Sequence, residues 1–447
     1  MNISKFLIFI FFCFSLRSEN YLLIDDETET FLNEIVEKIK SALKFKQEIN
    51  IYVLDDQSIN AAALEDGNIL INSGAIVRID NHEELIAILA HEIGHVEGGH
   101  IISYISNSGD FLKAGLVTTL IGAIASICAK DSSPLIAGTI SGQAMSTNMA
   151  LTKIQQKENI ADTKAVEAVK TLKWPVLNGF VSLHKKMSEH STEYGGYIST
   201  HPQSKDRVLK FEEHARKLKG QKTPKHVLDL MKEYEKKFKR IKHKLTALTS
   251  PIQLLSDLYK NPKNSDEEYA RAIALYRTNK NEEAIKLIDK LTDKCGEDQA
   301  YYTEIKAMCL INMGECDKAA DVSWDILKND KKNKVHRDLG LIYALATISK
   351  NIKKHVASAI KVLKKILIIH KNDVSAKSML GNLYAISGDL EKASLCAAEI
   401  ALNNGDFSTA KFHAKKAINC NDPITKRKAN DIILLADEQK KDSENPF

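Results

Sequence analysis

The sequence predicts a mostly helical α+β protein with two domains, a mixed domain over residues 19–250 and an α-solenoid over residues 251–447. Three observations predict this class. The chain of 447 residues exceeds the size at which single hydrophobic cores stop growing, about 250–300 residues. Strand-like alternation occurs at residues 49–76, and in the C-terminal half an alanine returns at a nearly regular interval within helical patterns.

The composition is that of a globular protein, with 44% hydrophobic and 27% charged residues. A formal net charge of +5 arises from 63 basic and 58 acidic residues that are mixed along the chain. Nucleic-acid binding needs basic residues concentrated on one face, so we expect no nucleic-acid partner. The seven cysteines form no C-x-x-C pair, which gives no support to a cysteine metal cluster.

Residues 1–18 have the pattern of a secretory signal peptide. Lys5 precedes an apolar run from Phe6 to Phe14, and a polar exit follows it. An uncleaved anchor is the alternative, because the small residues of a cleavage site are not clearly present. We expect cleavage near Ser18 and therefore export.

The first part of the mixed domain alternates helices with short strands. A helix is expected from about residue 27 to 44, followed by short strands within residues 49–76 that an Asp-Gly turn separates. Asn81 with Glu84 three residues later resembles a capping box, and it begins a helix that contains the sequence HEIGHVEGGH from His91 onward.

An uncharged stretch of 16 residues, 114–129, falls short of the roughly 20 apolar residues that cross a bilayer. We expect a buried helix or one at a membrane interface, with a spanning segment as the alternative, so residues 111–150 are the expected peripheral membrane contact. Further helices are expected at residues 144–172 and, as a connection between the domains, at 227–248. The basic run 236–244 lies in the connecting helix and is interpreted as a solvated face.

The repeated alanines are Ala284, Ala319, Ala359 and Ala393, at intervals of 35, 40 and 34 residues. Turn residues precede three of them by five positions, at Asn279, Gly314 and Gly388. Such a period is typical of tetratricopeptide repeats, which stack helix pairs around a concave surface suited to holding another polypeptide. The longer interval predicts a loop insertion near Lys350 to Lys354. An unrelated helical bundle is the alternative.

The H-E-x-x-H motif predicts two metal ligands and a base on one helix. His91 and His95 are four residues apart, so both rings project from one face and reach one Zn²⁺ at about 2.0–2.1 Å. Glu92 is then turned toward a water on that metal and can take its proton. The alternative is an amphipathic helix with polar histidines, but buried imidazoles need partners.

The motif lacks the third protein ligand that catalytic zinc requires. A metzincin would have a histidine at residue 101, where this chain has Ile101. A carboxylate on a second helix is therefore expected, and the sequence ENIAD supplies Glu158. Asp162, four residues later on the same helical face, can accept the N–H of a ligand histidine. A pair of surface carboxylates is the alternative.

The sequences LAHEIGHVEGGH, ENIAD and STHPQSKDR, in this order, resemble the zinc metallopeptidase family that includes HtpX, the CAAX prenyl protease and Oma. With the signal peptide and the repeats, the resemblance is strongest to periplasmic members that act in outer-membrane barrel assembly. It implies a gluzincin-type domain with one Zn²⁺ per chain. The implied ligands are His91, His95 and Glu158, with Glu92 as general base and Asp162 behind a ligand.

The resemblance also implies roles outside these two helices. His201 is either a donor to the oxyanion of the tetrahedral intermediate or a removable fourth zinc ligand that keeps the enzyme idle, and we favour the ligand; a plain loop histidine is the alternative. Gly195-Gly196 offers a hinge, and Arg207 either binds the reacting carbonyl or stabilises the loop. The residues similar to the family's substrate-pairing strand are Asn60, Ala61, Ala62, Ala63 and Leu64.

The sequence therefore predicts an exported zinc-dependent endopeptidase. The resemblance implies that it works in the periplasm, with membrane association as a further expectation, on unfolded or misassembled outer-membrane proteins, with the barrel-assembly machinery as a partner. The alternative is a chaperone or scaffold that binds clients through its repeats, with latent or minor proteolysis.

Overall fold

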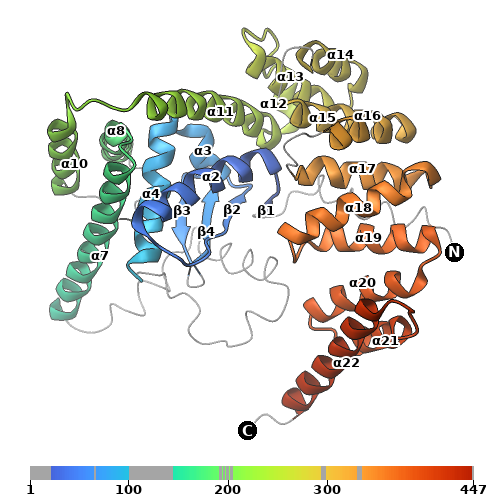
Figure 1. The fold of residues 1–447 in the computed structure, drawn as a ribbon. Helices are drawn as coiled ribbons and strands as arrows, with labels where there is room; N and C mark the ends of the chain where they lie inside the picture. Colours follow the sequence, from blue (N-terminus) through green and yellow to red (C-terminus); the bar gives the residue numbers. More distant parts are fainter. Residues whose placement is uncertain are drawn as a thin grey trace. The chain divides into compact units, whose positions relative to one another are not determined.

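The computed structural model describes residues 22–64, 67–99, 144–190, 205–292, 298–329 and 335–444, together with Tyr194, Tyr197 and His201. These residues form two compact units (Figure 1). The N-terminal unit reaches Pro251, and the C-terminal unit begins at Ile252. Four predictions fall outside the described residues: the signal peptide, residues 111–143 of the membrane contact, Asp66 of the turn, and Gly195-Gly196. Within the described ranges, no helix has the length and apolar character needed to cross a membrane.

A small mixed sheet lies in the N-terminal unit, with the strand order β1-β2-β4-β3. The strands are β1 (Leu22–Leu23), β2 (Ile51–Leu54), β3 (Ala61–Ala63) and β4 (Ile69–Asn72). β2 and β4 pair in parallel, whereas β1 and β3 pair antiparallel to their neighbours. This order leaves β3 at one edge of the sheet. The sequence did not predict β1, because two residues are too few to show an alternating pattern.

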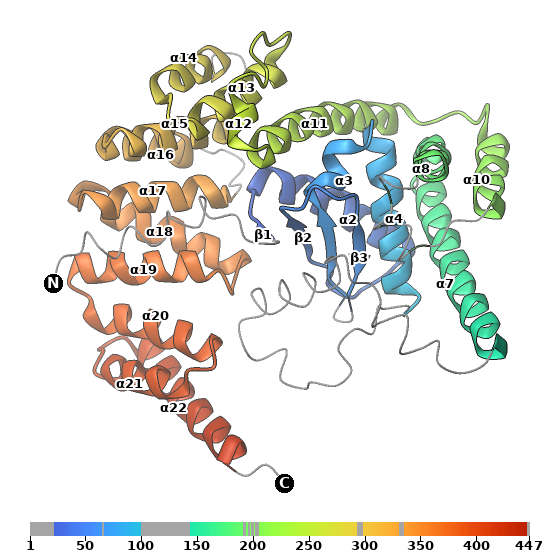
Figure 2. The same ribbon diagram turned by 180° about the vertical axis from the view of Figure 1, so that it is seen from behind.

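Helices pack around this sheet and share one apolar core with it. They are α2 (Asp26–Leu43), α3 (Ser73–Arg78), α4 (His82–Glu97), α7 (Ala144–Thr171), α8 (Leu177–Glu189), α10 (Lys205–Leu218) and α11 (Lys225–Thr249). The predicted helices at residues 27–44, 144–172 and 227–248 are confirmed to within two residues. α2 contacts β2, and α4 contacts both β3 and α7, an arrangement that Figure 2 shows from behind.

The start of α4 is fixed as the capping pattern predicts. The Glu84 backbone N–H donates to Asn81 Oδ1 at 3.0 Å, and Glu84 accepts the backbone N–H of Asp80 at 2.9 Å. Lys186 and Ser182 of α8 also donate to the Glu84 carboxylate, at 2.8 and 2.6 Å. The first turn of α4 is therefore tied to α8 as well as capped, which fixes the helix that carries the H-E-x-x-H motif.

The C-terminal unit is a run of helices in which each contacts the next, and it fits a repeat solenoid. The helices are α12 (Ile252–Leu255), α13 (Ser265–Arg277), α14 (Asn281–Thr292), α15 (Gln299–Asn312), α16 (Cys316–Asn329), α17 (Arg337–Ser349), α18 (Lys353–Ile369), α19 (Val374–Ser387), α20 (Leu390–Asn403), α21 (Phe407–Ala417) and α22 (Pro423–Glu444). Ala284, Ala319 and Ala359 are fully buried, as their periodicity suggests, and Ala393 is half-buried.

The loop insertion expected near Lys350 to Lys354 is wrong. Only residues 350–352 join α17 to α18, and part of the extra length lies in α18 itself, which has 17 residues where α16 has 14. The turn is made by Asn351, whose φ of 50° is left-handed like that of Gly314 in the preceding pair. Because α18 is longer, Asn351 lies eight residues before its alanine instead of five, and the spacing rule missed it.

The basic run of α11 is not a wholly solvated face, contrary to the prediction. Arg240 and Lys244 are buried, and both contact Glu27 at the start of α2. Lys244 Nζ also lies 2.5 Å from Asp25 Oδ1. These contacts hold the long helix α11 against α2, whereas the more exposed Lys239 pairs with Glu235 of the same helix.

Glu27→Ala should lower the free energy of unfolding by about 3–5 kcal/mol, because it leaves two buried cations without their shared carboxylate. Glu235→Ala, which removes one partner of an exposed pair in α11, should cost no more than about 1 kcal/mol. Urea unfolding of the two variants measures the difference. Equal losses would show that the buried cluster does not hold α11 in place.

Candidate active site

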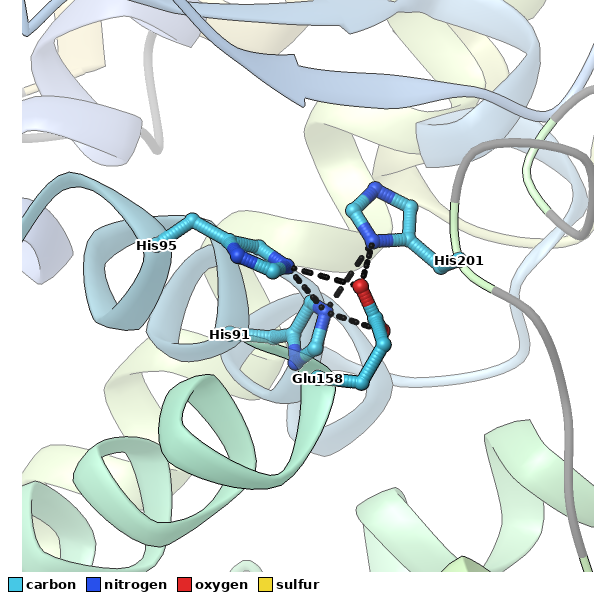
Figure 3. Close-up of side chains that lie close together, drawn as sticks. All are labelled: His91, His95, Glu158 and His201. Atoms are coloured by element: carbon cyan, nitrogen blue, oxygen red, sulfur yellow. Dashed lines mark hydrogen bonds and ion pairs between the residues drawn. The ribbon is translucent and has the colours of Figure 1, made fainter. Parts of the chain in front are cut away.

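Four buried side chains bring their donor atoms together (Figure 3): His91 and His95 from α4, Glu158 from α7, and His201. These atoms all lie within 4.8 Å of one another. His91 Nε2 lies 3.0 Å from His95 Nε2, 3.2 Å from His201 Nδ1 and 3.3 Å from Glu158 Oε2. Glu158 Oε1 lies 3.2 Å from His95 Nε2 and 3.3 Å from His201 Nδ1.

The separations suit one small cation. Four donors placed tetrahedrally at 2.0–2.1 Å from a Zn²⁺ are roughly 3.3–3.4 Å apart, close to the values observed here. The donor types, three imidazoles and one carboxylate, are also those that zinc accepts. The cluster therefore can bind a metal ion, as the H-E-x-x-H and ENIAD motifs predict.

Asp162 fixes the orientation of the central histidine. Its Oδ1 lies 2.9 Å from His91 Nδ1, so Nδ1 carries the proton and Nε2 presents its lone pair to the cluster. Burial alone would raise the pKa of Asp162, but its hydrogen bond to His91 and the charge of Arg207 lower it below its usual value. Asp162 is thus an ionised acceptor, in the position predicted for it.

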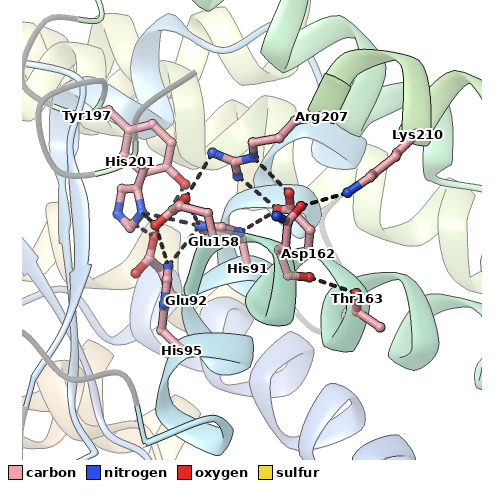
Figure 4. A network of polar contacts seen from close by, with 11 residues as sticks. His91, Glu92, His95, Glu158, Asp162, Thr163, Tyr197, His201, Arg207 and Lys210 are labelled. Atoms are coloured by element: carbon pink, nitrogen blue, oxygen red, sulfur yellow. Dashed lines mark hydrogen bonds and ion pairs between the residues drawn. The ribbon is translucent and has the colours of Figure 1, made fainter. Parts of the chain in front are cut away.

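Arg207 of α10 joins the two carboxylates (Figure 4). Its Nε and Nη2 donate to Asp162 at 2.7 and 2.8 Å, and its Nη1 lies 2.9 Å from Glu158 Oε2. Bidentate guanidinium–carboxylate contacts are strong and set a fixed geometry. The two roles predicted for Arg207 were binding of the reacting carbonyl and stabilisation of the loop; the contacts observed are to the two carboxylates, which Arg207 holds in place.

Glu92 is completely buried beside the metal-binding cluster. Its Oε1 lies 3.3 Å from His201 Nε2 and accepts a hydrogen bond from the Tyr197 hydroxyl at 3.3 Å. Among the described residues, its Oε2 has no hydrogen-bond partner. A buried oxygen without a partner is unfavourable unless a bound molecule donates to it. A general base needs such a free acceptor atom to take a proton from water.

Two residues of the site were not predicted. Gly94, inside the H-E-x-x-H motif, lets α4 approach α7 so closely that an added Cβ would lie 2.5 Å from the carbonyl oxygen of Ala161. Tyr197 contacts Glu92, and its ring centroid lies 4.5 Å from that of His201. The available signal for Tyr197 was its position in the sequence, four residues before His201.

The predicted substrate strand is β3, with Asn60 and Leu64 at its ends. In its antiparallel pairing with β4, Asn60 accepts from the Asn72 N–H at 2.9 Å and Leu64 donates to Asn68 at 2.8 Å. Because antiparallel hydrogen bonding alternates along a strand, the N–H and C=O groups of Ala61 and Ala63 point away from β4, toward the open edge. The strand also contacts α4, which carries the motif.

A histidine-rich cluster that can hold a metal ion, with a buried carboxylate beside it and an edge strand nearby, is the arrangement of a metallopeptidase, a metal-dependent hydrolase of peptide bonds. Residues 26–215 match the model of peptidase family M48, which supports the same class: the chain is a metallopeptidase. This confirms the resemblance that the three motifs indicate.

Two proteins named beta-barrel assembly-enhancing protease are similar to most of the chain. The one from Yersinia pestis is 21% identical over 415 residues, which cover 90% of this chain and 81% of that protein. The one from Escherichia coli K12 is 22% identical over 435 residues, covering 90% and 84%. The similarity extends beyond the M48 domain into the helical C-terminal unit.

Gly94→Ala should weaken metal binding by about tenfold or more, since the added methyl pushes Ala161 of α7 away and displaces Glu158 from the histidines. It should also lower the free energy of unfolding by about 1–3 kcal/mol, although alanine normally stabilises a helix relative to glycine. Zinc titration and urea unfolding measure the two effects. Gly381→Ala, in the helix α19, is the control and should leave zinc affinity unchanged. A stabilised Gly94→Ala protein with normal metal affinity would contradict the close helix contact.

Proposed function

We propose that the chain is a zinc-dependent endopeptidase with one Zn²⁺ held by His91, His95 and Glu158. The observation that carries this proposal is the set of donor separations, 3.0–3.3 Å, which fits a tetrahedral zinc site. The buried Glu92 carboxylate beside the donors supplies the base that peptide hydrolysis needs. The match of residues 26–215 to peptidase family M48 supports the same chemistry.

Each protein group has a separate part in hydrolysis. A bound Zn²⁺ supplies a Lewis acid that polarises a peptide carbonyl. Glu92 takes a proton from the attacking water as the new C–O bond forms, and then passes it to the leaving amine as the C–N bond breaks. Asp162 keeps the His91 lone pair directed at the metal, and Arg207 holds the Asp162 and Glu158 carboxylates in fixed positions.

The edge strand supports an endopeptidase acting on extended chains. The outward N–H and C=O groups of Ala61 and Ala63 can pair with a substrate backbone as an added strand. Ala62 and its neighbours contribute only methyl groups, so recognition rests on the backbone. Such pairing would lay a peptide bond across the site next to α4.

His201 is proposed to close the site in the resting state. Its Nδ1 occupies the fourth donor position, while its Nε2 lies 3.3 Å from Glu92. The imidazole thus fills the space between metal and base, where water and substrate must enter. Catalytic zinc keeps one open position, so His201 has to leave before hydrolysis.

The likeness to the beta-barrel assembly-enhancing proteases supports a more specific setting. We propose an exported, periplasmic peptidase whose substrates are misassembled outer-membrane proteins, with the barrel-assembly machinery as partner. The C-terminal helix pairs are proposed to be tetratricopeptide repeats that hold these clients. Left-handed turn residues at Asn279, Gly314 and Gly388 and buried alanines support this identification.

Glu92→Gln should lower the turnover of an unfolded protein by a factor of about 10²–10⁴ while zinc stays at one per chain, because it removes the base but no ligand. Glu158→Gln, the matched change on α7, should instead weaken zinc binding. Casein cleavage and metal analysis measure both effects. If neither the original protein nor Glu92→Gln cleaves the client, and both keep it equally stable, the chain is a scaffold.

His201→Ala should increase cleavage at low substrate concentration, including cleavage of the protein itself, with zinc retained. The closed form no longer competes with substrate for the fourth position. Gel analysis of the stored protein and a peptide assay measure this change. An inactive His201→Ala protein with full metal content would mean that His201 donates to the oxyanion.

A further inference from the structure

We propose that the Tyr197 hydroxyl holds the general base Glu92 in the resting site, so that the side chains of Tyr197 and His201 together block the base and the metal position. The inference rests on the proposed function, because it gives Glu92 the role of base. Tyr197 acts through Glu92 and is therefore a positioning residue.

The contacts at Glu92 carry the first step. Tyr197 Oη and His201 Nε2 both lie 3.3 Å from the same oxygen, Oε1. Burial raises the pKa of Tyr197 well above its usual value, and the nearby Glu92 charge raises it further, so the phenol stays protonated and donates. This carboxylate oxygen accepts the Tyr197 hydroxyl and lies against the His201 ring, so it is less available to a water.

Backbone geometry carries the second step. The His201 N–H donates to the Tyr197 carbonyl at 2.8 Å, which links the two residues through their backbones. The two rings lie 4.5 Å apart at 38°, and both residues are 3% exposed. Figure 4 shows both rings beside Glu92. Because the hydrogen bond and the ring contact join Tyr197 and His201, His201 cannot withdraw from the metal position without moving Tyr197. Withdrawal of His201 therefore releases Glu92 and the fourth metal position at once.

Tyr197→Phe tests the proposal, since it keeps the buried ring and removes the hydroxyl. A closed form that excludes substrate raises KM and leaves kcat unchanged, so the variant should lower KM for a quenched fluorescent peptide roughly two- to tenfold at constant kcat. Tyr194→Phe removes the hydroxyl of a second buried tyrosine close in sequence and is the control. A fall in kcat for Tyr197→Phe would overturn the proposal and make Tyr197 a donor to the oxyanion.

Amide hydrogen exchange of residues 190–207 in the full chain gives a readout that does not depend on activity. Tyr197→Phe should speed exchange about two- to tenfold, but it should add nothing in a Glu92→Ala background, where the acceptor is already gone. Equal acceleration in both backgrounds would show a merely structural tyrosine and overturn the proposal. Failure of the proposed function appears separately, as full activity of Glu92→Gln.

Discussion

The close crossing of α4 and α7 at Gly94 is the constraint on which the site depends. Two backbones meet there without a side chain between them, and this brings Glu158 of α7 within 3.3 Å of the α4 histidines. Ligands from one helix alone have a fixed spacing and cannot surround an ion. The third donor must come from a second backbone at a defined distance, and glycine sets that distance.

Around this crossing, the polar groups form two connected layers. Asp162 and Arg207 lie behind the donors and hold them, whereas Glu92, Tyr197 and His201 lie in front of them. A buried polar network is favourable only when its members satisfy one another. In the front layer the Tyr197 hydroxyl satisfies one oxygen of Glu92, whereas the other oxygen, Oε2, has no hydrogen-bond partner among the described residues, so on the proposed function this is the oxygen that can accept from a bound water.

Much of the site could be predicted from the sequence, because helical spacing relates residues three or four apart. His91 with His95, and Glu158 with Asp162, follow from that rule. Gly94 and Tyr197 could not be predicted in the same way, since their roles depend on which segments meet. The buried positions of Arg240 and Lys244 depended likewise on the acidic start of α2, more than two hundred residues away in the chain. In the repeats, the turn residue Asn351 could not be found by the five-residue spacing before the alanine, because α18 is longer than the other helices compared.

The alanine edge strand has a consequence for selectivity. A folded protein has already satisfied its backbone N–H and C=O groups, whereas a chain that has failed to fold still exposes them. An edge that offers backbone groups flanked by methyls discriminates poorly between sequences but well between conformations. On the proposed function, β3 selectively binds chains that have not folded. It has only three residues, so its edge is too short to form stable β-structure with neighbouring copies of the protein.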